Sequence, residues 1–266
     1  MSNILGSIDF GSAKNLSEIA DLGSSSFSPL KSDVYPATID NAYIKQTDSG
    51  SLMFYLKATV AGGREVSDSW CIYSGSTGPV DKGGKKLIGI STVDNLLALV
   101  AGTSLDEIKT KPNDVVLKKI EERKYIDGKW EPVTVNAYVV KPLLGKQVQL
   151  AVLLRREYKK TLSNGEWITG NETTDKNKIV NFFEITTGFS AAEKIAHDSY
   201  VAKAKAHTGD ISELGPEPVP VKIGEWRKRW SGIVDDKTRT STAMSSRNDN
   251  PLIGPGSSDI DLIAGL

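Results

Sequence analysis

Hydrophobic and polar residues alternate with a period of two between residues 33 and 73. Three runs show this pattern, YPATIDNAYI, SLMFYLKATV and REVSDSWCIY, and the short polar segments TDSG and AGG separate them. Alternation of this kind is typical of half-buried strands, and short glycine-containing connections favour hairpin turns. The pattern therefore predicts a three-stranded antiparallel meander.

The period changes after this meander. Residues 91–102, STVDNLLALVAG, combine a hydroxyl or carboxylate cap, an apolar stretch of helical spacing and a terminal glycine, and so predict a helix. Two more strand-like runs follow at 147–155 and 178–185. The dipeptides Asp127–Gly128 and Asn164–Gly165 favour the positive backbone angles of tight turns, which predicts two additional hairpins.

Three strands, a helix and two strands form the element order of an OB-fold, a small Greek-key barrel whose outer face and loops bind single strands or oligosaccharides. We therefore predict a mainly β protein: an OB-fold barrel with hairpin insertions, a helix between its third and fourth strands, a C-terminal helix and a flexible tail. The predicted divisions are an N-terminal arm at 1–30, the OB-fold domain at 31–188, a helix and basic connector at 189–232, and the tail at 233–266.

Composition limits the chemistry. The 266 residues carry 33 Lys and Arg against 33 Asp and Glu, so any attraction to nucleic acid must come from local segregation of charge. A single cysteine, Cys71, excludes an internal disulfide framework, and with only two histidines a zinc site is not expected. The sequence has no apolar run of secretory or membrane-spanning length. We expect a cytoplasmic protein without a cofactor or metal.

Residues 66–86, VSDSWCIYSGSTGPVDKGGKK, place aromatic residues beside glycines and lysines. A phosphate-binding loop is the first candidate, because glycine lets backbone amides approach an anion. The spacing rejects it: the pattern that begins at Gly78 reaches Gly83, but Gly84 and Lys85 follow where Lys and then Ser or Thr are required.

Strand alternation provides another use for these residues. With Phe54 and Leu56 facing the core, Tyr55 and Lys57 face outward, and Trp70 points inward on the third strand while Tyr73 points outward. Bases can stack on the tyrosines while lysines hold the phosphates. The alternative is that the tyrosines cover the barrel and the lysines form a solvated loop. The candidate residues are Tyr55, Lys57, Tyr73, Lys82, Lys85 and Lys86.

A second basic region follows. Residues 141–178 hold eight cations and four anions, and RREYKK interleaves a tyrosine with four cations. This is the arrangement expected of a hairpin that follows a nucleic-acid backbone, although a charged hairpin can also simply be solvated. EWRKRW also has two interpretations. It resembles a basic patch, but Trp226 and Trp230 have helical spacing and can equally dock on the barrel. The candidates in the hairpin are Arg155, Arg156, Tyr158, Lys159 and Lys160.

Several segments together, in order, resemble bacteriophage single-stranded DNA-binding proteins of the OB-fold type. They are SDVYPATIDNAYI, REVSDSWCIYSG, VDKGGKK, STVDNLLALVAGTSL, LLGKQVQLAVLLRREY and NKIVNFFEITTGFSAAE, and the resemblance covers roughly residues 31–195. It implies a protein that coats single-stranded DNA during phage replication, recombination or repair. The chain departs from the usual pattern at its end, where DIDLIAGL has two aspartates and a terminal leucine in place of a dense acidic run with an aromatic terminus.

The tail is a candidate docking motif for replication, recombination or transcription proteins, although it can also be a disordered terminus or pack on the barrel. Its candidate partner-binding residues are Asp259, Asp261, Leu262 and Leu266. Catalysis is not expected, because the nearest carboxylate pair, Asp33 and Asp40, falls on opposite faces of one predicted strand, and the basic regions lack the clustered acids of a nuclease. The remaining alternative is a protein-interaction or virion structural module built on the same barrel.

Overall fold

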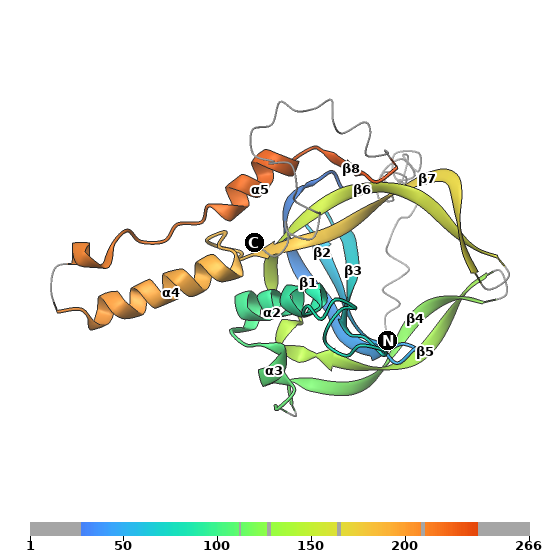
Figure 1. Ribbon diagram of the computed structural model, residues 1–266, viewed down its shortest axis with the longest axis horizontal. Helices are drawn as coiled ribbons and strands as arrows, with labels where there is room; N and C mark the ends of the chain where they lie inside the picture. Colours follow the sequence, from blue (N-terminus) through green and yellow to red (C-terminus); the bar gives the residue numbers. More distant parts are fainter. Residues whose placement is uncertain (1–27, 112, 127–128, 164–165, 209–210, 239–266) are drawn as a thin grey trace, which may run out of the picture.

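The computed structural model describes residues 28–111, 113–126, 129–163, 166–208 and 211–238. This described part of the chain is mainly β, and its eight strands belong to one sheet. Helices lie beside this sheet, and two long hairpins extend from it (Figure 1). The elements in chain order are β1 (Asp33–Gln46), β2 (Leu52–Val60), β3 (Arg64–Tyr73), α2 (Ile88–Ala101), α3 (Leu105–Ile108), β4 (Val115–Ile126), β5 (Lys129–Val140), η3 (Lys141–Leu143), β6 (Gln147–Ser163), β7 (Glu166–Phe183), α4 (Ala191–Ala206), η4 (Ile211–Leu214), α5 (Lys222–Trp230) and β8 (Val234–Asp236).

The predicted meander is present as β1, β2 and β3, which pair antiparallel in sequence order. Phe54, Leu56 and Val60 are buried, as the alternation predicted, and Trp70 is buried on β3. Hydrophobic residues on every second position of these strands therefore face one common core.

The two predicted hairpins are present and are longer than their sequence signals. In one, Ile126 of β4 lies opposite Lys129 of β5; in the other, Ser163 of β6 lies opposite Glu166 of β7. Each register leaves a two-residue connection, and the predicted turn dipeptides that fill these connections lie outside the described residues. The runs predicted as separate strands at 147–155 and 178–185 are the inner parts of β6 and β7.

Strand β1 is shared among three neighbours. One of its edges pairs with β2, whereas the other pairs with β6 over residues 33–38 and with β5 at Tyr43 and Ile44. The register with β2 shifts between Ile39 and Asn41, and such a bulge bends a strand. The bend allows one strand to leave β6 and continue alongside β5.

The sheet is not closed, and a side chain joins two of its edge strands, β3 and β7. The Asp68 carboxylate of β3 accepts a hydrogen bond of 2.9 Å from the backbone N–H of Ile179 on β7. The same carboxylate lies 2.6 Å from Nζ of Lys178, and the Asp68 side chain is 7% exposed. A buried carboxylate therefore takes the place that a backbone carbonyl of a neighbouring strand would occupy in a closed sheet.

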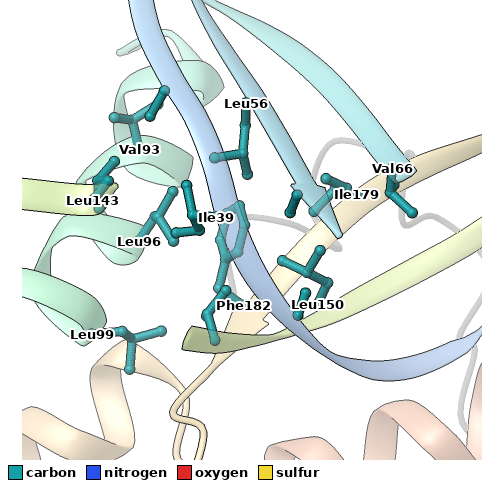
Figure 2. Packing of buried hydrophobic residues seen from close by; sticks show 14 of the residues in the cluster. Ile39, Leu56, Val66, Val93, Leu96, Leu99, Leu143, Leu150, Ile179 and Phe182 are labelled. Carbon is teal, nitrogen blue, oxygen red and sulfur yellow. The ribbon is translucent and has the colours of Figure 1, made fainter. Parts of the chain in front are cut away.

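Helix α2 packs on the main core, which also receives side chains from β1, β2, β6 and β7 (Figure 2). Val93, Leu96 and Leu97 of this helix are fully buried. The helix begins at Ile88, before the run 91–102 that predicted it, and Gly102 follows its end as that run predicted. Its first turn lies directly on β3, because a Cβ added at Gly89 would meet the carbonyl oxygen of Cys71 at 2.2 Å.

A second hydrophobic cluster covers the opposite face of β6. Trp226 of α5 packs there with Ala151, Leu153 and Phe183, and it is 5% exposed. Of the two interpretations of EWRKRW, the structure therefore has the helix docked on the sheet. Strand β6 is buried on both faces at this point, which explains its nearly continuous hydrophobic sequence.

The two ends of the folded region differ from the predicted boundaries. Leu30, assigned to the arm, is buried in the main core, and its N–H and carbonyl both bond to the side chain of Asn177. Residues 234–236, assigned to the tail, form β8, which pairs parallel with β6. Residues 1–27 and 239–266 lie outside the described part of the chain.

Glu193 connects α4 to α5. Its carboxylate accepts hydrogen bonds from N–H and Oγ of Ser190 and from the N–H groups of Val221 and Lys222, at distances of 2.8 to 2.9 Å. Burial acts to raise the pKa of Glu193, but the hydrogen bonds to its charged form outweigh burial and lower it.

Replacing Asp68 tests the link between β3 and β7. Asp68→Ala leaves the Ile179 N–H and Lys178 without their acceptor, so we expect it to lower the free energy of unfolding by about 1–3 kcal/mol in a urea titration. Asp68→Asn keeps one oxygen for the N–H and should lose less. The exposed neighbour Ser67→Ala is the control. A stability of Asp68→Ala equal to that of Ser67→Ala would contradict the assigned role.

The lowered pKa of Glu193 predicts a pH dependence. The stabilisation is present above the ordinary glutamate pKa of about 4.3 and is lost as pH falls through the lower pKa of the folded state. Glu193→Gln should therefore melt at a lower temperature than the wild type at pH 7, and the difference should shrink in acid as wild-type Glu193 becomes protonated. Glu131→Gln, on the exposed surface of β5, is the control. A difference that stayed constant with pH would argue against this role of the charge.

Candidate nucleic-acid interface

The outward face of the meander carries a pair of stacked tyrosines. Tyr43 of β1 lies directly opposite Tyr55 of β2 in the ladder. Their ring centroids are 4.9 Å apart, and the ring planes differ by 10°. Tyr55 faces away from the core as predicted, but Tyr43 covers part of its ring.

Two charged residues hold this pair in place. The Tyr43 hydroxyl donates a 2.8 Å hydrogen bond to the Glu122 carboxylate of β4, and Lys45 Nζ lies 2.5 Å from the other oxygen of that carboxylate. Lys45 Nζ also lies 5.0 Å from the centre of the Tyr55 ring. Burial, reinforced by the hydrogen bond to Glu122, raises the pKa of Tyr43 well above its usual range, so this hydroxyl remains a donor.

Sequence reasoning missed Tyr43 and Lys45, although a signal for them was present. Tyr43 lies in the first run and Lys45 follows two positions later, so the two residues share one side of a strand, and the short turn after them limits which residues of the second run face them. With Thr47 bonded to Ser51 across the turn, counting back along both strands places Tyr43 opposite Tyr55.

Tyr73 lies at the end of β3, where the loop begins. Its side chain is 44% exposed, and one edge of its ring lies near Gly78. It is separated from Ser69, the residue opposite Tyr55, by four positions, or roughly 13 Å of strand. Tyr73 therefore offers more open ring surface for stacking than Tyr55 does.

The lysine loop after Tyr73 has a defined backbone. The Asp81 carboxylate accepts hydrogen bonds from the N–H groups of Gly83 and Lys85, at 2.8 and 2.9 Å. Amides that a phosphate-binding loop would direct at its ligand are thus used by the chain's own carboxylate, in agreement with the rejection of that motif on spacing. The Lys82 and Lys85 side chains are exposed.

Most of the predicted cations have a carboxylate beside them. Lys82, Lys85 and Lys160 have no ion-pair partner among the residues that the structure describes. The five paired cations and their partners are Lys57 with Glu65, Lys86 with Asp94, Arg155 with Asp235, Arg156 with Asp175, and Lys159 with Glu172.

Arg155 and Arg156 are less exposed than the paired lysines: their side chains are 26% and 42% exposed, against 44–58% for Lys57, Lys86 and Lys159. Arg155 Nε donates a 2.8 Å hydrogen bond to Asp235 of β8. Arg156 donates two hydrogen bonds, of 2.8 and 2.9 Å, to the carboxylate of Asp175 on β7. These contacts raise the pKa of Arg156 and, with the hydrogen bond as the largest cause, lower that of Asp175.

The two predicted groups of site residues lie on different parts of the sheet. Tyr55, Lys57 and Tyr73 lie on β2 and β3, whereas the hydrogen bonds and ion pairs of the RREYKK group run to β7, to β8 and to Thr238 just beyond it. Tyr158 belongs to this second group and is 40% exposed. The tail candidates Asp259, Asp261, Leu262 and Leu266 lie outside the described residues.

No family model and no curated protein matches the chain. In the described ranges, no helix is long and apolar enough to cross a membrane, and no three His, Cys, Asp or Glu side chains are grouped so as to hold a metal ion.

Proposed function

We propose that the protein binds single-stranded DNA without sequence preference through the outward face of β1, β2 and β3. The observation that carries the proposal is an exposed aromatic at the end of β3, Tyr73, followed within one ordered loop by Lys82 and Lys85, two cations without an ion-pair partner among the described residues. Aromatic rings stack on any base, and cations beside them hold the connecting phosphates.

We further propose that the sheet is an OB-fold in which β1, β2, β3, β6 and β7 are the barrel strands and the β4–β5 hairpin is an insertion. Three observations support it: β1 pairs with both β2 and β6, β6 pairs with β7, and Asp68 joins β7 to β3. OB-folds bind oligonucleotides on the face of their second and third strands and on the adjoining loops. In this chain β2 carries Tyr55 on its outward side, and Tyr73 ends β3 just beyond a register shift between the two strands.

The ion pairs divide the candidate cations into two groups. Lys57 and Glu65 are 44% and 62% exposed, and a pair as exposed as this contributes little, so phosphate replaces the carboxylate at small cost. Arg155 and Asp235 are 26% and 13% exposed and link β6 to β8. We therefore assign DNA contacts to the lysines and a mainly structural role to Arg155 and Arg156.

On the sequence resemblance, the protein serves phage DNA replication, recombination or repair, and residues 257–266 recruit a protein partner. The alternating acidic and apolar residues of DIDLIAGL support this role for the end of the chain.

Tyr73→Ala tests the proposed stacking. Loss of one stacked base should weaken binding to a labelled oligonucleotide by about 1–3 kcal/mol, or roughly 5- to 150-fold. The matched control is Tyr138→Ala, because Tyr138 of β5 is 49% exposed and lies outside this face. Both variants are measured against single-stranded and duplex DNA. Equal affinities of the two variants for single strands would refute the stacking role of Tyr73.

The salt dependence of binding tests the cations. If about four to eight phosphates are contacted, the slope of log affinity against log salt should be about −3 to −6, because each contact contributes about 0.7 on single strands. The double variant Lys82→Ala/Lys85→Ala should reduce the size of the slope by about 1.4. Lys203→Ala/Lys205→Ala, at the far end of α4, should leave it unchanged. Equal slopes for both double variants would exclude the loop from the interface.

A further inference from the structure

Strand β4 is a free edge of the sheet. It pairs with β5, and at the end of the strand order no described strand covers its other edge. Its 12 residues, VVLKKIEERKYI, contain no proline, and its register with β5 continues without a shift from Val115 to Ile126. Proteins usually protect such an edge by prolines, bulges, a short strand or charged side chains, because a row of unpaired backbone groups is a template for another strand, and of these devices β4 has the charges alone.

The charges along β4 are arranged antisymmetrically about Ile120. Lys118 and Lys119 precede it, and Glu121 and Glu122 follow it. Lys119 and Glu121 are exposed, and the described part of the chain contains no ion-pair partner for either of them. When a second copy of the strand runs in the opposite direction beside the first, the lysines of each copy therefore face the glutamates of the other.

We propose that β4 pairs antiparallel with β4 of a second copy of this chain, with Ile120 opposite Ile120 at the centre. Lys119 of each copy then lies opposite Glu121 of the other, and Lys118 lies opposite Glu122. Opposite charges at directly facing positions stabilise an antiparallel pair, whereas like charges destabilise it.

The charges also select this register. Residues that face each other in an antiparallel pair lie on the same side of the sheet. In a two-fold pair of identical strands, one residue must therefore face its own copy at the centre of the pair. The neighbouring registers are those in which this central residue is Lys119 or Glu121 in place of Ile120. A centre at Lys119 places two lysines opposite each other, and a centre at Glu121 places two glutamates opposite each other. Both neighbouring registers are therefore disfavoured by charge.

The pairing would put the two meander faces on one side of a continuous sheet. Ile120 lies on the same side of β4 as Glu122, which contacts Tyr43. Because facing residues share a side, both copies present Tyr43 and Tyr55 in the same direction. The association itself does not require DNA and does not rest on the proposed function.

Sedimentation of the full chain without DNA, over a series of protein concentrations, tests the proposal. The wild type should form dimers. Lys119→Glu and Glu121→Lys should each weaken self-association by about tenfold, because each places like charges opposite each other in both symmetry-related pairs. Thermal unfolding of these surface variants should match that of the wild type.

Mixing the two variants gives the decisive measurement. The Lys119→Glu variant has glutamate at both 119 and 121, and the Glu121→Lys variant has lysine at both. In an equimolar mixture of the two, opposite charges face each other again, so heterodimers should form with the affinity of the wild type. The double variant Lys119→Glu/Glu121→Lys should also associate normally, and Glu131→Lys on β5 is the matched control for a charge change beside the edge. A wild type that stays monomeric, unchanged association of the single variants, or no recovery on mixing would each overturn the proposal.

Discussion

The architecture depends on β1 changing its neighbour halfway along its length. Asp40 occupies the bulge, and its carboxylate is held by a 2.6 Å hydrogen bond from the Thr59 hydroxyl of β2. Beside the bulge, the N–H and carbonyl of Ile39 bond to Lys146 and Gly145, immediately before β6 begins. The backbone groups that a bend would otherwise leave unpaired therefore have partners. The bulge in β1 therefore sends the β6–β7 hairpin and the β4–β5 hairpin along separate paths. Buried residues of β1, β5 and β6 nevertheless belong to one core.

The sequence was most informative where the physical signal is local. Alternation in the second run was enough to place Phe54 and Leu56 inside, because side chains on a strand must alternate whatever the strand pairs with. The tight turns could be located for a similar reason, since the dipeptides at their tips have their own backbone preferences. The fate of Trp226 was not local, because helical spacing of two tryptophans suits a docked helix and an exposed basic helix equally well. Only its contact with Phe183 and Leu153, in another part of the chain, distinguishes the two.

The pairing of the cations was hidden for a different reason. Counting outward from the turn of the β6–β7 hairpin, where Ser163 faces Glu166, places Thr173 opposite Arg156. The register shift between Tyr158 and Lys160 brings Asp175 there instead. A bulge thus decides whether an arginine has a carboxylate beside it. Net charge over a window of sequence is therefore a poor guide to the charge that a surface presents, because β structure tends to place cations of one strand against anions of the next.

The turn closed by Asp81 has a consequence for the energetics of any anion at this loop. Fixing the backbone of a single residue costs about 1–2 kcal/mol in conformational entropy. When a loop becomes ordered only on binding a ligand, this cost is subtracted from the binding free energy for each residue that is ordered. Here the hydrogen bonds from Gly83 and Lys85 to Asp81 already order the backbone during folding. An anion that met this loop would therefore have only the lysine side chains left to restrain, and the backbone cost would already have been met during folding.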